Sequence, residues 1–199
     1  GKIIYRLPNH HFDIKATSPG RGTIVLLGGV IDYGEINRNL FWIRPNYVDT
    51  VYSTSDWTDV RPYYIIQRNN RAADYAWSVR MKVGDITRED AEREQLCNVY
   101  ALKSGLLFNY LFNPKQQGAG FCPANGKSKT ISRLFKNDID SYCPSIDLWQ
   151  AIAYKTLYQK EDYLYLLIDA FKFFEEGAKS PFPDLTEESN PVLVKLKLK

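Results

Sequence analysis

The sequence predicts an α+β fold: an antiparallel β-rich first part, a helical segment and a C-terminal strand–helix–helix–strand (βααβ) unit. Three observations support this prediction. Residues 1–85 hold short runs of aromatic and β-branched residues separated by turn signals. Residues 86–113 open with a helix-capping pattern. Residues 145–171 contain two helix-like halves with a charged break between them.

Short strands are expected throughout the β-rich part, residues 1–85. KIIYRL and HHFDIKA are candidate strands, and GTIVLLGGVID is typical of a buried strand with a break at Gly28 and Gly29. Four further candidates follow: NLFWIRPN, YVDTVYSTS, PYYIIQRN and YAWSVRMKV. The last alternates apolar residues with Ser78, Arg80 and Lys82, which predicts a half-buried strand. The turn signals between the runs are SPGRG, DYGEINRN, RPN and RNNRAAD.

The chain then changes from strand-like to helix-like patterns. In GDITREDAEREQLCNVYALKSGLLFNYLF, Thr87 is a candidate N-cap, and Asp90 follows three residues later. Leu96, Val99 and Tyr100 have helical spacing. NPKQQGAGFCPANGKSK is rich in Gly, Pro, Asn and Gln, as loops are. The expected organisation is therefore a β-rich domain with a following helix (1–113), a loop or linker (114–130) and a second domain (131–199).

The second domain is interpreted from SIDLWQAIAYKTLYQKEDYLYLLIDAF, residues 145–171. Asp147 is expected to cap a helix from about residue 148 to 158, and Asp162 a second helix after the break QKED. Candidate strands flank this helix pair, at Ile139–Tyr142 and at the alternating Val192–Leu198, and we expect them to pair. One face of the helix pair is predicted to be buried core: Ile152, Leu164, Leu167 and Ile168.

This segment, about residues 138–199, resembles the LysM module, a βααβ unit whose first helix reads D-T-L-W-x-I-A-x-x-Y. The matching residues are Asp147, Leu148, Trp149, Ile152, Ala153, Tyr154, Tyr158, Tyr163, Leu164, Leu167, Ile168, Asp169 and Ala170. Ser145 departs from the family's glycine, and Phe171 from its terminal Asn. The resemblance implies either binding of peptidoglycan or chitin, or an assembly role like that of related modules in contractile phage tail baseplates. A single module without Ser/Thr-rich linkers fits the assembly role better.

Composition excludes several classes of protein. With 44% hydrophobic and 25% charged residues, the 199-residue chain is expected to fold. Its net charge of +3 gives no support to nucleic-acid binding, and no run is apolar for long enough to cross a membrane. The opening GKIIYRLPNHHF lacks the apolar core of a signal peptide. A cytoplasmic or virion location is therefore expected, and export after removal of a signal stays open.

Cysteine and histidine usage predicts no metal site or cofactor. Cys97, Cys122 and Cys143 are too few for a disulfide framework, although a pair between Cys122 and Cys143 stays open. The chain has no CxxC or Cys/His cluster of zinc-ligand spacing.

An enzymatic alternative rests on three short motifs in the order found in toxin-type ADP-ribosyltransferases: Arg6, Ser53-Thr54-Ser55 and Glu92 or Glu94. In that family the arginine holds the NAD phosphates, the serine positions the nicotinamide ribose, and the last glutamate stabilises an oxocarbenium-like transition state. That chemistry needs the glutamates at a strand edge beside a cleft. Here they fall in TREDAEREQL, which is predicted to be helical, so we expect no NAD-dependent activity.

The sequence as a whole favours a non-enzymatic structural or assembly protein that binds other protein subunits, such as a phage tail or baseplate component. Four Trp, fourteen Tyr and ten Phe are more than a small core takes up, and surface aromatics anchor protein interfaces. A glycan is the alternative partner; no nucleic acid or membrane is expected. The interface candidates lie beside turn signals: Phe41, Trp57, Tyr63, Phe173 and Phe174.

Overall fold

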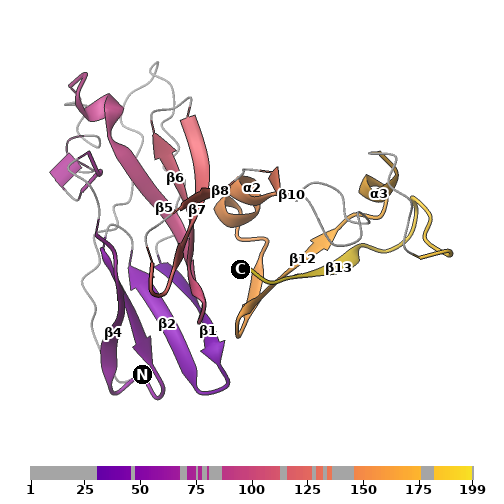
Figure 1. Ribbon diagram of the computed structural model, residues 1–199, viewed down its shortest axis with the longest axis horizontal. Coiled ribbons are helices and arrows are strands. Elements are labelled where there is room, and N and C mark those ends of the chain that lie inside the picture. The colour runs from indigo at the N-terminus through magenta and orange to yellow at the C-terminus, as the bar shows by residue number, and fades with distance from the viewer. Residues whose placement is uncertain are drawn as a thin grey trace, which may run out of the picture.

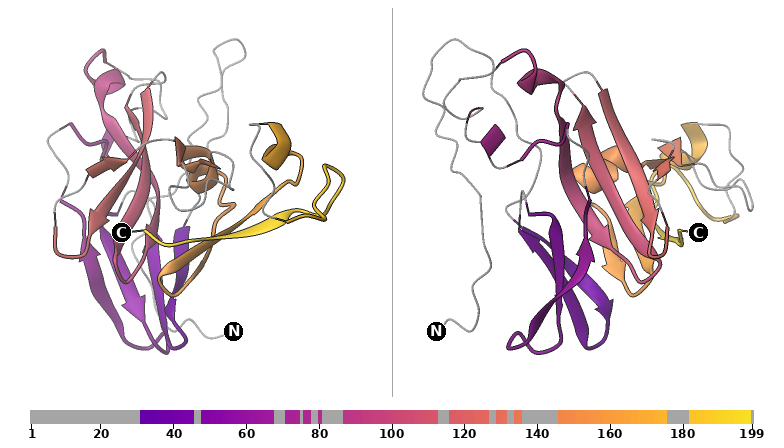
Figure 2. Two further views of the ribbon diagram at one scale, coloured as in Figure 1. Left: turned by 45° about the vertical axis from the view of Figure 1, so that its right-hand side comes forward. Right: turned by 60° about the vertical axis from the view of Figure 1, so that its left-hand side comes forward.

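The computed structural model describes residues 31–45, 48–67, 71–74, 76–77, 80, 87–112, 116–126, 129–131, 134–135, 146–175 and 182–198. These residues form three layers (Figure 1, Figure 2). A four-stranded N-terminal sheet packs on one face of a four-stranded central sheet. Helix α2 and a three-stranded C-terminal sheet cover the other face of the central sheet. All three sheets are antiparallel.

The N-terminal sheet has the strand order β1-β2-β3-β4, with bounds Ile31–Asn37, Leu40–Pro45, Thr50–Thr54 and Val60–Ile65. Strands β2 and β3 lie inside runs whose aromatic and β-branched content predicts strands, and β4 begins two residues before such a run, PYYIIQRN. Strand β1 lies largely in DYGEINRN, where a turn was predicted, and that prediction is wrong. Pairing with β2 overrides the polar composition, and the chain turns only at Arg38 and Asn39, where Asn37 Oδ1 accepts from the Asn39 amide at 3.1 Å. The strands expected within residues 1–30 lie outside the described residues.

The central sheet has the order β5-β6-β7-β8, with bounds Glu94–Ala101, Gly105–Phe112, Gln116–Pro123 and Lys129–Ile131. Both of its faces are buried. Val99 and Ala101 pack toward the N-terminal sheet, whereas Tyr100 and Leu102 pack toward α2 and the C-terminal sheet. A sheet covered on both sides lies in the middle of the molecule (Figure 2).

This double burial explains why the predicted helix after Thr87 is wrong. A strand buried on both faces reads as a continuous apolar run without period-two alternation, so its spacing also fits a helix. The described residues 94–101 and 105–112 instead form the hairpin β5–β6. The predicted loop is wrong in the same way, because 116–123 is strand β7. Its small residues Gly118 and Gly120 leave room for the rings of Tyr110 and Phe108 on β6.

The reciprocal Thr87–Asp90 hydrogen bonds of the capping pattern form, but the N-cap of the turn that follows is Glu89. The Asp90 amide donates to Thr87 Oγ1 at 3.1 Å, and the Thr87 amide donates to Asp90 Oδ2 at 3.2 Å. Only the 3-10 turn η1 (Asp90–Glu92) follows, and Arg93 is already extended. Hydrogen bonding by Arg80, with the amide of Thr87, lowers the pKa of Asp90. The contact between Thr87 and Asp90 was therefore predicted correctly, but the N-cap residue and the length of the helix were not.

The predicted strand YAWSVRMKV is wrong where the structure describes it. Residues 76, 77 and 80 have helical conformation, and Trp77 is buried with its indole N–H donating to the Asp90 carbonyl at 2.9 Å. The other predicted strand, Ile139–Tyr142, lies outside the described residues. The two-stranded pair β9–β10 (Leu134–Phe135 and Ile146–Asp147) leads into α2.

Helix α2 (Leu148–Ala153) begins where the sequence predicts and ends earlier. Asp147 caps it, accepting from the Gln150 amide at 3.1 Å. The amides of Lys155 and Thr156 donate to the carbonyls of Ile152 and Ala151, and Lys155 has φ of 53°. This left-handed C-terminal motif stops the helix.

The second predicted helix is wrong, because residues 158–168 form a β-hairpin. The C-terminal sheet has the order β11-β12-β13, with bounds Tyr158–Lys160, Tyr163–Ile168 and Val192–Leu196. Leu164, Leu166 and Ile168 are buried at a period of two, so YLYLLI is an amphipathic strand. The short helix α3 (Lys172–Glu175) follows β12. Strand β13 lies where the sequence predicts a strand, and its described partner is β12.

The described C-terminal residues therefore contain one short helix and a hairpin where the LysM resemblance implies two helices in succession. The expected α+β class with a βααβ unit is wrong, and the described part of the chain is dominated by antiparallel sheets. None of its helices is long and apolar enough to cross a membrane.

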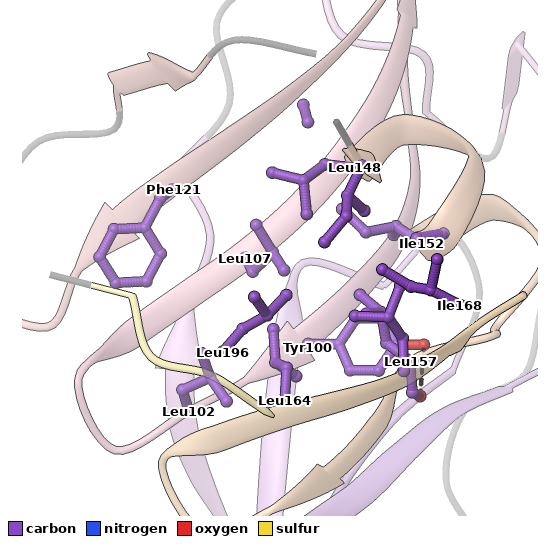
Figure 3. Close-up of a cluster of buried hydrophobic side chains, with 14 of the residues drawn as sticks. Tyr100, Leu102, Leu107, Phe121, Leu148, Ile152, Leu157, Leu164, Ile168 and Leu196 are labelled. Atoms are coloured by element: carbon purple, nitrogen blue, oxygen red, sulfur yellow. Dashed lines mark hydrogen bonds between the residues drawn. The ribbon is translucent and has the colours of Figure 1, made fainter. Parts of the chain in front are cut away.

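The larger core lies between the central sheet, α2 and the C-terminal sheet (Figure 3). Ile152, Leu164 and Ile168 are buried there together, as predicted. Leu167 was expected beside them and is 66% exposed, because a strand turns its side chain to the opposite face. Figure 3 also shows the Tyr100 hydroxyl donating to the Leu157 carbonyl at 3.2 Å.

Candidate functional site

A hollow of about 360 Å³ lies where strands β1 and β2 meet β5 and β11, and we call it the aromatic pocket. Its volume falls within the range of small-ligand and side-chain pockets. Six of its fourteen lining residues are aromatic. The lining is Asp32, Tyr33, Gly34, Glu35, Phe41, Trp42, Trp57, Asn98, Val99, Tyr100, Lys155, Leu157, Tyr158 and Gln159.

Three aromatic side chains stand exposed in the lining. Tyr33 is 74% exposed, Tyr158 is 62% exposed and Trp57 is 43% exposed. Trp57 stacks on Phe41, with ring centroids 6.1 Å apart and planes at 20°. Two of these rings come from the N-terminal sheet and its β3–β4 loop, and Tyr158 comes from the C-terminal sheet. The pocket therefore opens to solvent between two sheets that are distant in sequence.

The loop between β3 and β4 holds Trp57 in a specific backbone conformation. Trp57 has φ of 65°, a left-handed conformation that side-chain-bearing residues rarely adopt. The Thr54 hydroxyl accepts from the Trp57 amide at 2.8 Å. Asp56 Oδ1 accepts from the amides of Thr58 and Asp59 at 2.9 and 3.2 Å, and the bond from Thr58 lowers the pKa of Asp56. Such strain clusters at functional sites, which makes Trp57 a candidate contact residue.

Gln159 organises the inner wall of the aromatic pocket. Its Oε1 accepts from the Trp42 indole at 3.0 Å, and its Nε2 donates to the carbonyls of Ala101 at 2.6 Å and Glu35 at 3.0 Å. One buried amide thus links all three sheets. Gly34 permits this arrangement, because a Cβ there would lie 2.6 Å from the Trp42 indole nitrogen and 2.8 Å from Gln159 Oε1.

A buried ionic group forms the floor next to Gln159. Asp32 Oδ2 accepts from Arg44 Nη1 at 3.0 Å and from the Val99 amide at 3.2 Å. Lys155 Nζ lies 3.5 Å from Asp32 Oδ1 and donates to the Ile31 carbonyl at 2.9 Å. Burial raises the pKa of Asp32 above its ordinary value, against the opposing effects of Arg44 and Lys155. These contacts fix the positions of β1, β2 and the end of α2 relative to one another.

Asp32, Lys155 and Gln159 are thus engaged by other groups of the protein, whereas the rings of Tyr33, Trp57 and Tyr158 remain exposed. Asp32 and Lys155 pair with each other, and the amide of Gln159 is engaged at both ends. What the pocket presents to a ligand is mainly apolar and aromatic surface, with the half-buried Glu35 beside it. This arrangement suits binding of an apolar group in a preformed site.

Two of the five interface candidates meet in this pocket, Phe41 and Trp57. Tyr63 lies elsewhere, with its ring 4.7 Å from that of Tyr64 and packed on the smaller core. Phe173 is 2% exposed and belongs to the larger core, against which Phe174 also packs. Phe173 therefore offers no surface to a partner, because it lies on α3 with its side chain buried in the larger core.

The residues of the ADP-ribosyltransferase hypothesis do not line the aromatic pocket. Ser53 and Thr54 lie on β3, where Thr54 is buried and its hydroxyl accepts from the Trp57 amide. Glu92 lies in η1 and Glu94 begins strand β5, so the helical placement expected for Glu94 is wrong. Arg6 lies outside the described residues.

Sequence reasoning missed most of the site, including Tyr33, Tyr158 and Gln159. Tyr33 lies in a segment predicted to be a turn, Tyr158 lies at the predicted end of the first helix, and Gln159 lies in the break QKED that follows it. A signal was present for the hairpin, because YQK and YLY flank the turn residues Glu161 and Asp162 with alternating aromatic positions. Nothing in the sequence indicated that Gln159 would meet Trp42, which is 117 residues away.

Among the described residues, no three His, Cys, Asp or Glu side chains come together as metal ligands would. No protein-family model matches the chain, and neither do any of the curated proteins or solved structures with which it was compared.

Proposed function

We propose that this is a non-enzymatic binding protein that anchors another protein in the aromatic pocket. One observation carries the proposal: exposed rings of Tyr33, Trp57 and Tyr158 surround a hollow in which the polar groups of Asp32, Trp42 and Gln159 are already hydrogen-bonded. A partner would therefore gain the most binding free energy there by inserting an apolar or aromatic side chain, which excludes water from the rings.

The character of the exposed residues supports a protein partner. Trp and Tyr are the side chains most enriched among the residues that dominate binding energy in protein interfaces. They bury large areas at a small cost in side-chain entropy. Trp57 is further restricted by its stacking on Phe41 and by the hydrogen-bonded loop that carries it. A contact residue that is already ordered loses less entropy on binding.

Glycan binding is the second candidate, because exposed tryptophan and tyrosine rings also stack on sugars. Specific sugar binding depends on several polar groups placed to receive hydroxyls. In the aromatic pocket Trp42, Gln159 and Asp32 are engaged within the protein, which favours the protein partner. The wall-binding and baseplate roles were implied by the LysM resemblance, which requires a βααβ unit. Because the described residues do not form that unit, we propose neither role.

The test is site-directed photocrosslinking in cells of the source organism. p-Benzoylphenylalanine replaces Tyr33, and in a matched control it replaces Ile65, which is 72% exposed on the opposite edge strand β4. We expect a discrete crosslinked protein from position 33 that disappears in a Trp57→Ala background and is not formed from position 65. Failure to crosslink a protein, combined with Trp57-dependent retention on peptidoglycan or chitin, would establish the glycan candidate instead.

A further inference from the structure

The C-terminal sheet has a second face that its own core does not use. Leu164, Leu166, Ile168 and Leu196 point inward to the larger core. By register the opposite face carries four cross-strand pairs: Tyr158 with Tyr165, Lys160 with Tyr163, Tyr165 with Lys195, and Leu167 with Leu193. We call this surface the outer face. Strands β12 and β13, which carry most of the outer face, run away from the central sheet (Figure 1).

One end of the outer face is apolar. Leu167 and Leu193 lie directly opposite each other, 66% and 63% exposed. A single exposed leucine is ordinary, but a cross-strand pair of them forms a continuous apolar surface. Such a pair stabilises the sheet little while it faces water, and covering it would remove apolar area from solvent.

The remainder of the outer face combines tyrosines with lysines. Lys160, Lys195 and Lys197 are exposed. Lys195 Nζ lies 3.7 Å from the Tyr163 ring centroid, and Lys197 Nζ lies 5.7 Å from it. Within the described residues, none of these three lysines forms an ion pair with a carboxylate. The nearby acid Asp162 accepts from the Ser104 amide at 2.8 Å, and Glu161 lies in the turn.

The outer face is continuous with the aromatic pocket through one residue. Tyr158 lines the pocket, and its ring centroid is 6.3 Å from that of Tyr165 on the outer face. A ligand that contacts Tyr158 in the pocket therefore lies beside the tyrosines and lysines of the C-terminal sheet. Pocket and face together form one surface, with an aromatic hollow, a basic middle and an apolar end.

We infer that the protein partner runs from the aromatic pocket across the outer face as a segment of alternating acidic and apolar residues. This inference rests on the proposed function and adds the chemistry of the partner. Acidic side chains complement three lysines that have no carboxylate partner among the described residues, and apolar side chains cover Leu167 and Leu193. The leucine pair favours a polypeptide over a nucleic acid, whose phosphates gain nothing from leucine. Lys195 over Tyr163 also occupies a ring face on which a base would stack.

The probe is a fluorescein-labelled peptide of alternating glutamate and leucine, titrated with the full chain and followed by fluorescence anisotropy. We expect saturable binding that weakens as salt is added, because exposed charge pairs are screened. Lys195→Gln with Lys197→Gln should weaken it about three- to tenfold, and Leu167→Ser with Leu193→Ser by a similar factor. Arg61→Gln removes an exposed cation from the N-terminal sheet and should leave binding unchanged.

Three results of the binding titrations would overturn the inference. The first is that the glutamate–leucine peptide does not bind. The second is that the lysine and leucine variants bind it as tightly as wild type does. The third is that an oligothymidylate of equal charge binds more tightly than the peptide and is weakened by the same substitutions. The last result would identify a nucleic-acid surface. None of these results bears on the proposed function, because that function is tested separately by crosslinking from position 33 and its dependence on Trp57. A crosslinked partner that is indifferent to the Lys195 and Lys197 substitutions would likewise remove only the inference about the outer face.

Discussion

The indole N–H of Trp42 donates to Oε1 of Gln159 at 3.0 Å, with both side chains buried. The bond joins β2 of the N-terminal sheet to β11 of the C-terminal sheet. Since the same Gln159 amide also donates to carbonyls of β1 and β5, it holds in place the wall from which the aromatic pocket is built.

Gln159→Ala should lower the free energy of unfolding by about 2–4 kcal/mol, because it leaves the Trp42 indole without its partner and removes a hydrogen bond to each of two carbonyls. Lys160→Ala, at the exposed next position of the same strand, should change it by less than about 0.5 kcal/mol. Urea unfolding of both variants measures this difference. Equal effects would show that the Gln159 bonds do not hold the sheets together.

Two leucines of strand β12 test the corrected secondary structure. Leu164 is fully buried and Leu167 is 66% exposed, so Leu164→Ala should cost about 2–5 kcal/mol and Leu167→Ala less than about 1 kcal/mol. A helix with a face at i and i+3 would instead bury both and give two similar losses. Denaturant melts of the two variants decide between strand and helix.

The sequence predicted short-range features well and the pairing of distant segments badly. The cap at Asp147, the reciprocal bonds of Thr87 and Asp90, and strands β2, β3 and β4 depend on neighbouring residues, and each was readable. Strands β5 and β6 were not, since burial on both faces removes the alternation that identifies a strand. In YLYLLI, leucines at i and i+3 satisfied a helical pattern, although the alternation of a half-buried strand was present as well.

The candidate site was predictable only in part for the same reason. Phe41 and Trp57 stood out because each is a large aromatic beside a turn signal. Their meeting with Tyr158 and Gln159 depends on the packing of the C-terminal sheet against the N-terminal sheet, which no local pattern encodes. Gly34 matters because the Trp42 indole packs closely against it and leaves no room for a side chain. The sequence does not reveal this contact, because a glycine in a polar segment is ordinarily interpreted as part of a turn.

The left-handed backbone at Trp57 gives a prediction that separates strain from ring contacts. Trp57→Gly and Trp57→Ala both remove the ring, but only glycine adopts φ of 65° without steric cost. The glycine variant should therefore be more stable than the alanine variant by about 1 kcal/mol. Thermal and urea unfolding of the pair measure the difference, and a more stable alanine variant would contradict the strained loop.

Burial of Cys97 predicts a loss of stability at alkaline pH. It raises the pKa of this thiol from 9.0 to about 12 in the folded protein. The folded state is therefore at its full stability, with respect to this thiol, below pH 9. That stability is lost as the pH rises toward 12, because the thiol ionises at a lower pH in the unfolded protein than in the folded protein. Between about pH 8 and about pH 10.5, wild type should lose roughly 1–2 kcal/mol more than Cys97→Ala.

The comparison with Cys97→Ala isolates the thiol, since burial also raises the pKa of Tyr100 and that effect is present in both proteins. Urea titrations at the two pH values give the four free energies needed. Equal losses in the two proteins would mean that Cys97 reaches solvent in the folded state.

The central proposal is that the aromatic pocket anchors a protein partner. The most direct measurement is the affinity of the partner crosslinked at position 33 for wild type and for Trp57→Ala, by isothermal titration calorimetry on proteins shown to be folded. We predict that removal of the Trp57 ring weakens binding by about 2 kcal/mol, which is roughly thirtyfold. An unchanged dissociation constant would contradict the pocket as the anchoring site.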